Sequence, residues 1–169
     1  MVRKPKIILL AGPTGSGKSK LAISLSKKLN GEIVNADSMQ VYKEFKILTS
    51  RPNLQDKKKI KHHLYGIISV RKKFSTGNWL KLTTNLITKI LKKKKIPVIV
   101  GGTGLYFKAL LDGLVKIPNI PLEFRNKIRK YNKKIGQEKF YNKLLKLDPK
   151  IKSFISLNDT QRSLRAYEV

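Results

Sequence analysis

The residues best suited to chemistry in this chain form a glycine-rich run near its start. The run fits G-x-x-x-x-G-K-[ST] at every fixed position: Gly12, Pro13, Thr14, Gly15, Ser16, Gly17, Lys18 and Ser19. Glycines let the backbone wrap a phosphate so that amide N–H groups point inward. Lys18 adds a positive charge for the outer phosphate, and Ser19 offers a hydroxyl to a Mg²⁺ ion. The run therefore predicts a phosphate-binding loop with Mg²⁺ as cofactor; a glycine-rich turn without a ligand is the alternative.

The flanks of this loop are those that the pattern requires. Ile7-Ile8-Leu9-Leu10-Ala11 is a short apolar run of strand length, and apolar residues recur at helical spacing over 18–29. A strand, a loop and a helix in this order place the positive end of the helix at the phosphates. Asn30-Gly31 then ends the helix.

A candidate acid follows the next expected strand. Residues 32–36 are apolar enough for a buried strand, and Asp37 comes directly after them. Ligands of open α/β sheets bind beyond the carboxyl ends of the strands. We therefore expect Asp37 to lie on the same rim as the phosphate loop, with the capping of a following helix as its alternative role.

A third buried strand is expected over 96–100, followed by the small residues Gly101 and Gly102 and by a helix to about Leu111. Between these elements, 64–70 is a candidate short strand. Further candidate core positions recur at helical spacing: Trp79, Leu82, Leu86 and Ile90. Strands that alternate with helices predict an α/β fold with a parallel sheet. His62 and His63 lack a third ligand at metal spacing, so we interpret them as structural.

The chain changes character after this core. Two basic amphipathic helices joined at Gly136 are expected within 116–157, either as an RNA-binding hairpin or as packing helices with solvated lysines. Asn158 is the expected cap of a last helix, with Gln161 three residues later. The predicted organisation is a core over 1–115, a helical, basic insertion over 116–157 and the start of a return to the core over 158–169.

The net charge indicates which class of molecule the protein binds. The 169 residues contain 38 Lys and Arg against 10 Asp and Glu, which gives a formal charge of +28. Such an excess favours nucleic acid or another phosphate-rich partner, and compositional drift toward lysine is the alternative. The absence of cysteine excludes disulfides and thiolate metal sites. No stretch reaches the length of a membrane span, so a soluble, cytoplasmic protein is the expectation.

Together the motifs resemble those of the tRNA dimethylallyltransferase (isopentenyl-diphosphate:tRNA transferase) family. Four blocks carry the resemblance, in order along the whole chain: Ala11 to Ser19, Asn35 to Tyr42, Val100 to Leu111 and Asn158 to Val169. The resemblance implies a P-loop NTPase type of fold. It also implies a reaction in which dimethylallyl diphosphate alkylates the exocyclic amine of the adenosine 3′ of the anticodon, and the loop holds the leaving diphosphate rather than ATP.

The resemblance also implies roles for individual residues. Asp37 is the implied general base, and Lys18 and Thr103 are the other implied catalytic residues. Residues implied to contact tRNA are Asp37, Ser38, Met39, Gln40, Thr103, Arg125, Gln161, Arg162, Ser163, Leu164 and Arg165. The chemistry agrees, because backbone amides, Lys18 and Mg²⁺ stabilise charge on a departing diphosphate. A base in an anticodon stack must be flipped out to react. A monomer is the expected state.

Some residues depart from the family pattern. Gly15 stands where Ala is common, Lys61 where Pro is common, and Thr49-Ser50-Arg51-Pro52 replaces a Gly-Thr-Ala-Lys-Pro type of run. Family members also continue well past the last block, so the chain resembles a member truncated at its C-terminus. Two alternatives remain open: an ATP-dependent small-molecule kinase, and a tRNA-binding fragment without activity. The expected strand over 96–100 lacks a following acidic residue for Mg²⁺, which argues against the kinase.

Overall fold

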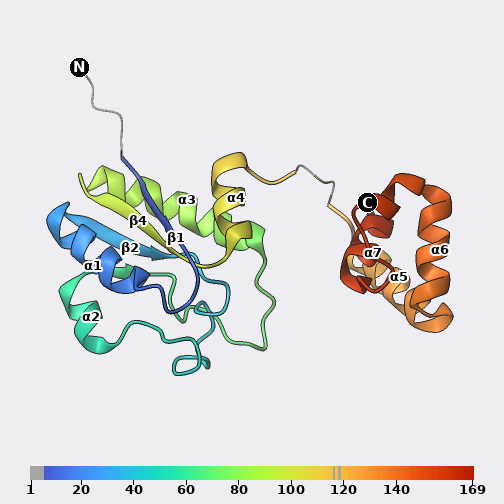
Figure 1. Ribbon diagram of the computed structural model, residues 1–169, viewed down its shortest axis with the longest axis horizontal. Coiled ribbons are helices and arrows are strands. Elements are labelled where there is room, and N and C mark those ends of the chain that lie inside the picture. Colours follow the sequence, from blue (N-terminus) through green and yellow to red (C-terminus); the bar gives the residue numbers. More distant parts are fainter. Residues whose placement is uncertain (1–5, 116, 118) are drawn as a thin grey trace, which may run out of the picture. The chain divides into compact units, whose positions relative to one another are not determined.

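The computed structural model describes residues 6–115, 117 and 119–169. It divides into two compact units, Met1–Leu114 and Val115–Val169, and each unit is described by itself (Figure 1). The predicted boundary at 115/116 lies one residue from this division, and residue 116 is outside the described residues. The assignment of these parts as separate domains stays a prediction.

The first unit is built on a four-stranded sheet in the order β1-β4-β2-β3. Its strands are β1 (Ile8–Ala11), β2 (Gly31–Asn35), β3 (His62–His63) and β4 (Ile96–Gly101). All neighbouring strands pair in parallel, with Leu9 opposite Ile99 and Ile33 opposite Val98. The carboxyl ends of β1, β4 and β2 therefore lie at one edge of the sheet.

Helices cover both faces of this sheet, which gives three layers (Figure 1). On one side, α1 (Lys18–Lys28) lies over a cluster that contains Ala22, Ile33 and Val98. The short helix α2 (Leu54–Lys59) has no buried residue. On the other side lie α3 (Thr76–Lys92) and α4 (Gly104–Asp112), over a cluster that includes Trp79 and Ile99. Successive strand residues point to opposite faces, which is why Val98 and Ile99 belong to different clusters. The predicted α/β class with a parallel sheet is confirmed.

The second unit is helical. It contains α5 (Leu122–Ile135), α6 (Gln137–Leu147), the short 3₁₀ helix η1 (Pro149–Ser153) and α7 (Thr160–Glu168). Gly136 joins α5 to α6 with φ of 84°, a left-handed conformation that favours glycine. Tyr141, Leu144 and Ile151 form its buried centre. Within this unit α7 packs against α5 and α6, and the assignment of 158–169 as the start of a return to the core stays a prediction.

Several local expectations need correction. The strand expected over 64–70 does not form: β3 ends at His63, because Leu64 has φ of 64° and cannot continue an extended strand. Within the described residues 64–70 only Ile68 pairs, in an isolated bridge with Tyr42. The cap of α7 is Asp159 rather than Asn158, since the Asp159 side chain accepts a hydrogen bond from the Arg162 N–H at 2.9 Å. Leu82 was expected in the core of α3, but it is 40% exposed.

No helix within the described ranges is both long enough and apolar enough to cross a membrane.

Candidate active site

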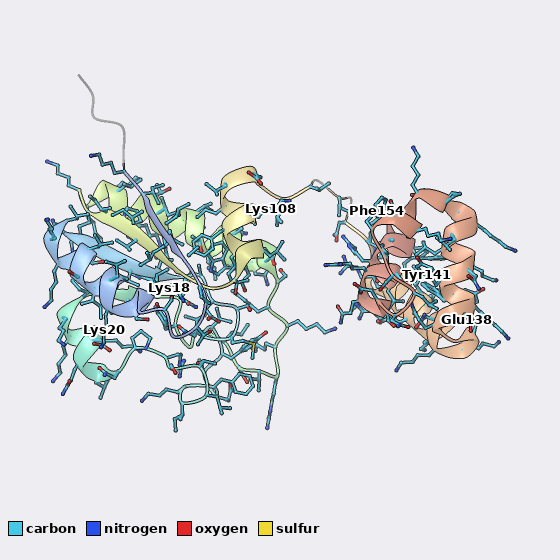
Figure 2. All side chains as sticks on the ribbon, in the orientation of Figure 1. Lys18, Lys20, Lys108, Glu138, Tyr141 and Phe154 are labelled. Atoms are coloured by element: carbon cyan, nitrogen blue, oxygen red, sulfur yellow. The ribbon has the colours of Figure 1, made fainter. Side chains whose placement is uncertain are left out.

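The glycine-rich run forms a loop between β1 and the start of α1. Gly15 and Gly17 have φ of 81° and 79°, so both occupy the left-handed region that glycine tolerates. Figure 2 marks Lys18 among the side chains of the first unit. The Lys18 ammonium donates to the Pro13 carbonyl and lies 3.3 Å from Ser16 Oγ. Its charge is therefore held at the concave side of the loop, where the sequence predicts phosphate.

Asp37 lies in a tight turn directly after β2. Its Oδ1 accepts hydrogen bonds from the backbone N–H groups of Met39 at 2.8 Å and Gln40 at 3.3 Å. Its Oδ2 makes no hydrogen bond to any part of the chain that the structure describes. No helix directly follows Asp37, so it does not cap one: Oδ1 closes a turn over 38–41, and Oδ2 remains available for proton transfer.

Asn35 anchors this turn from the last position of β2. The fully buried Asn35 side chain accepts from the Asp37 N–H at 3.0 Å and donates to the Leu64 carbonyl at 3.2 Å. Its own carbonyl accepts from the Trp79 indole N–H at 2.8 Å. Asn35 was not predicted as a functional residue, although a polar residue at the end of a buried strand was the available signal.

Thr103 links the carboxyl end of β4 to the Asp37 turn. Its Oγ1 accepts from the Ser38 N–H at 2.9 Å and lies 3.3 Å from Ser38 Oγ. The two strand ends approach closely because Gly101 has no side chain: a Cβ there would lie 2.1 Å from the Ala36 carbonyl oxygen. Thr103 is therefore placed where it can position the residues next to Asp37.

A cavity of about 280 Å³ is lined both by residues of the glycine-rich loop and by Asp37. Its walls include Thr14, Gly15, Lys18, Ser19, Asp37, Met39, Gln40, Tyr65 and Gly101. The structure thus places Asp37 and the phosphate loop on the same rim, as expected. Neither Thr103 nor Ser38 is part of the wall. Ser38 follows Asp37 in the chain, and Thr103 is hydrogen-bonded to Ser38.

Two tyrosines near Asp37 are held neutral. Burial, with a smaller contribution from the Asp37 charge, raises the pKa of Tyr65 far above its ordinary value. Burial, with contributions from Tyr42 and Asp37, raises the pKa of Tyr106 to about 12. Tyr106 stacks on Trp79 with ring centroids 4.3 Å apart. Tyr65 lines the cavity and was missed by the sequence analysis, which had no motif signal for it.

The side chains at the loop fit a Mg²⁺ ion that also binds phosphate. The Ser19 hydroxyl makes no hydrogen bond within the described residues, and it shares the cavity with the Asp37 carboxylate. Among those same residues no group of three or more His, Cys, Asp or Glu side chains could hold a metal alone. Mg²⁺ commonly binds through one or two protein oxygens plus substrate phosphates, so this sparse donor set suits it.

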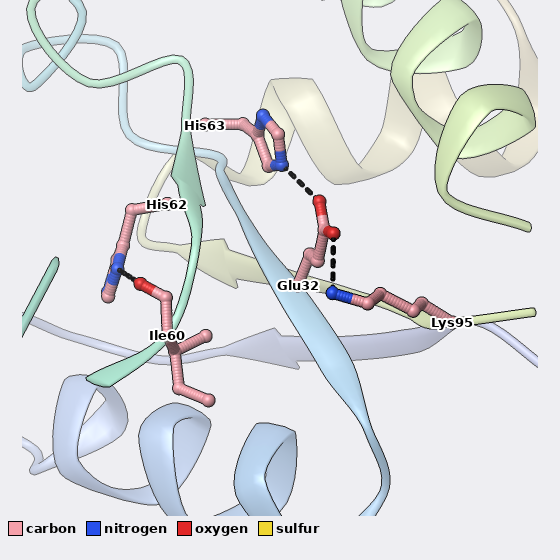
Figure 3. Close-up of polar contacts among 5 residues, drawn as sticks. All are labelled: Glu32, Ile60, His62, His63 and Lys95. Atoms are coloured by element: carbon pink, nitrogen blue, oxygen red, sulfur yellow. Dashed lines mark hydrogen bonds and ion pairs between the residues drawn. The ribbon is translucent and has the colours of Figure 1, made fainter. Parts of the chain in front are cut away.

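The two histidines make hydrogen bonds at and next to β2 (Figure 3). His63 Nε2 lies 2.7 Å from Glu32 Oε2, and Lys95 Nζ lies 3.0 Å from Glu32 Oε1. His62 Nδ1 hydrogen-bonds to the Ile60 carbonyl at 2.7 Å, and burial lowers the pKa of its imidazole. The interpretation of these histidines as structural agrees with their contacts.

The remaining candidate residues belong to the second unit. Gln161 and Arg162 are exposed, whereas the Ser163 side chain is fully buried and Leu164 and Arg165 are half-buried. Arg165 Nη1 lies 3.1 Å from Glu168 Oε2, and Arg125 Nε lies 3.7 Å from the same oxygen. Their proposed contacts with tRNA stay predictions, and the Ser163 side chain faces the interior of this unit.

Comparison with known proteins decides the family. The sequence profile described as IPP transferase matches residues 40–169. The chain belongs to this family. The resemblance read from the four motif blocks is thereby confirmed, and with it the P-loop NTPase type of fold.

Relatives within the IPP transferase family match the chain from end to end. A tRNA dimethylallyltransferase of Pelagibacter ubique is 65% identical over 169 residues, which are 100% of this chain and 54% of that protein. One of Rickettsia canadensis is 46% identical over 168 residues, 99% of this chain and 52% of that protein. The chain therefore spans about half the length of the curated relatives it matches.

Solved structures of family members superpose on the chain. A eukaryotic dimethylallyltransferase captured acting on tRNA has a TM-score of 0.81 and 33% identity, and covers 96% of this chain and 40% of its own. A tRNA isopentenylpyrophosphate transferase from Bacillus halodurans has a TM-score of 0.65 and 34% identity, with 98% and 55% covered.

Proposed function

We propose that this chain forms the catalytic core of a tRNA dimethylallyltransferase. Its substrates are dimethylallyl diphosphate and the adenosine immediately 3′ of the anticodon in tRNA. The observation that carries the proposal is the single cavity lined by Lys18, Ser19 and Asp37. A phosphate site and a free carboxylate oxygen in one cavity match a reaction that releases diphosphate and removes a proton.

In the proposed step, the exocyclic amine of adenosine attacks C1 of the dimethylallyl group. The N–C1 bond forms as the C1–O bond to diphosphate breaks, and the bonding electrons leave with the diphosphate. Negative charge grows on the departing oxygens, where the loop amides and the Lys18 ammonium stabilise it. Mg²⁺ bound near Ser19 would neutralise further charge on these phosphates.

Asp37 takes the proton that the amine loses. Its Oδ1 is fixed by two backbone N–H groups, so Oδ2 is presented in one orientation. A positioned general base contributes about 10²- to 10⁴-fold to the rate. Tyr65 and Tyr106 stay protonated at neutral pH, which leaves Asp37 as the base among these three side chains.

The test is prenyl transfer with a matched pair of variants. Purified chain is incubated with Mg²⁺, labelled dimethylallyl diphosphate and unmodified tRNA, and label in the tRNA is counted. Asp37→Asn keeps an oxygen for the Met39 and Gln40 N–H groups but cannot accept the proton. We expect it to lose at least about 100-fold in kcat, while its melting temperature stays near that of the unchanged chain.

Other outcomes would overturn parts of the proposal. Transfer that is undiminished in Asp37→Asn would remove Asp37 as the base. tRNA binding without transfer in the unchanged chain would favour the non-catalytic tRNA-binding alternative. Turnover of ATP on a small hydroxyl substrate, with no transfer from dimethylallyl diphosphate, would favour the kinase.

A further inference from the structure

Arg51 has an unusual environment in the first unit. Its guanidinium lies against Gly66: a Cβ built on Gly66 would be only 1.7 Å from Nη1. Gly66 has φ of 60°, and its N–H donates to the Gln40 carbonyl at 2.9 Å, in the turn that begins at Asp37. The guanidinium therefore packs on backbone that is hydrogen-bonded to the turn after the candidate base.

The donors of this guanidinium are poorly satisfied. Nη2 donates to the Lys43 carbonyl at 2.9 Å, but Nε is buried and has no hydrogen-bond partner. Within the described residues no carboxylate forms an ion pair with Arg51, although it is half-buried. Arg71 also lacks an ion pair there, but its side chain is exposed to solvent. A partly buried arginine without an acidic partner is costly, and a bound anion is a common reason for its retention.

The position of Arg51 relates it to the phosphate loop. Arg51 lines a second cavity, of about 260 Å³, together with Ser19, Ser50, Tyr65 and Val100. Those four residues also line the cavity that contains Lys18 and Asp37. The two cavities therefore adjoin at these four shared residues, one of which is Ser19, the last residue of the phosphate loop.

We propose that Arg51 is a second cationic binding residue for the diphosphate, acting from this adjoining cavity. That the ligand is the diphosphate of a prenyl donor rests on the proposed function. That Arg51 binds phosphate oxygens is independent of it. A guanidinium can bind two phosphate oxygens at once, which suits it to the end of the diphosphate away from the reacting carbon. Lys18 and Arg51 then hold the leaving group from two directions.

One carboxylate in the second cavity limits where the anion can lie. Asp56 also lines this cavity, on α2, and repels phosphate. Because Asp56 and Arg51 form no ion pair, the anion is expected on the Ser19 side of Arg51. Pyrophosphate that spans Ser19 satisfies this condition, whereas an anion deep in the second cavity does not.

The first experiment measures binding of inorganic pyrophosphate, with Mg²⁺, by calorimetry. Arg51→Gln is compared with Arg71→Gln, a change at an exposed arginine whose side chain forms no ion pair in the described structure. We expect Arg51→Gln to weaken pyrophosphate binding about tenfold to a hundredfold and Arg71→Gln to leave it within about twofold. Equal affinities in the two variants would overturn the proposal.

A second measurement needs no variant and so does not depend on the folding of Arg51→Gln. An arginine-specific dicarbonyl reagent is applied with and without saturating pyrophosphate, and modification is mapped by mass spectrometry. We expect pyrophosphate to protect Arg51 several-fold relative to Arg71. Loss of this difference would likewise overturn the proposal.

The source of the phosphate is tested separately. Dimethylallyl diphosphate and ATP are each tested for protection of Arg51 from the dicarbonyl reagent. Protection by dimethylallyl diphosphate at the lower concentration assigns the site to the prenyl donor. Protection by ATP alone removes that assignment. Failure of the proposed function is distinguishable. A chain that transfers no prenyl group but shows Arg51-dependent pyrophosphate binding retains this inference, and an active chain without that dependence loses only the inference.

Discussion

The Ser38 backbone N–H donates to Thr103 Oγ1 at 2.9 Å, across 65 residues of sequence. This bond joins the turn after β2 to the start of α4. Asp37 immediately precedes Ser38, so Thr103 controls the placement of the candidate base without belonging to the cavity wall. A role for Thr103 in positioning therefore follows from the geometry, beside its implied contact with tRNA.

Replacement of Thr103 tests this positioning role. Thr103→Val keeps the shape of the side chain but leaves the Ser38 N–H without its acceptor, which costs about 1–3 kcal/mol of unfolding free energy. We expect kcat for prenyl transfer to fall about tenfold or more, because a small misplacement near the reacting atoms is costly. Thr103→Ser retains the hydroxyl and should recover most of the activity. Equal losses in Val and Ser variants would contradict the role.

Gly101 determines how closely β4 approaches the end of β2. A Cβ at this position would lie 2.1 Å from the Ala36 oxygen and 2.2 Å from its carbonyl carbon, and backbone cannot yield as a side chain can. We expect Gly101→Ala to lower the free energy of unfolding by at least about 2 kcal/mol. Gly104→Ala is the matched control, because a Cβ there meets nothing within 4 Å. Chemical denaturation of both variants measures the difference.

Much of this site could be predicted because its signals are local. The phosphate loop is a contiguous pattern, and Asp37 directly follows an apolar strand. Parallel pairing of β1, β4 and β2 then brings both to one edge. The apolar runs predict the strands themselves, whereas the strand order β1-β4-β2-β3 and the paired positions come from the structure.

The features that the sequence did not predict depend on contacts between distant segments. Nothing near Arg51 in the sequence indicates that its guanidinium lies on Gly66, or that Tyr65 forms a wall of the cavity. The short β3 ends because Leu64 adopts a left-handed conformation that a leucine rarely takes. Such positions are imposed by tertiary packing rather than by local preference.

Glu32 makes stability depend on pH in the acidic range. Burial alone would raise the pKa of this carboxyl, but hydrogen bonds and charge from His63 and Lys95 lower it below its ordinary 4.5. As the pH falls, the unfolded chain therefore takes up a proton at Glu32 before the folded chain does. The stabilisation is fully present above about pH 4.5 and is lost as the pH falls through the lower folded value.

Melting temperatures between pH 3 and pH 7 test this dependence. Glu32→Gln should flatten the curve and lower the free energy of unfolding at pH 7 by about 2 kcal/mol, because the buried carboxylate loses its charged hydrogen bonds to His63 and Lys95. Asp112→Asn, at an exposed position at the end of α4, is the control and should leave the curve unchanged. If Glu32→Gln and the unchanged chain lost stability in parallel on acidification, another carboxyl would be responsible.

The last helix offers a test of RNA binding that separates surface charge from internal packing. Arg162 is exposed, and its ion pair with Asp159, at 3.4 Å, lies at the surface and is weak. The charge of Arg162 is therefore available to a phosphate. Ser163 is fully buried and lies 3.3 Å from Gln137 Nε2. We expect Arg162→Gln to weaken tRNA binding and to reduce the slope of log K against log salt by about 1. Ser163→Ala should lower the melting temperature while leaving that slope unchanged.

Two outcomes would contradict this assignment. A change of slope in Ser163→Ala would mean that the Ser163 hydroxyl turns outward and contacts tRNA. An unchanged slope in Arg162→Gln would mean that Arg162 does not contact RNA.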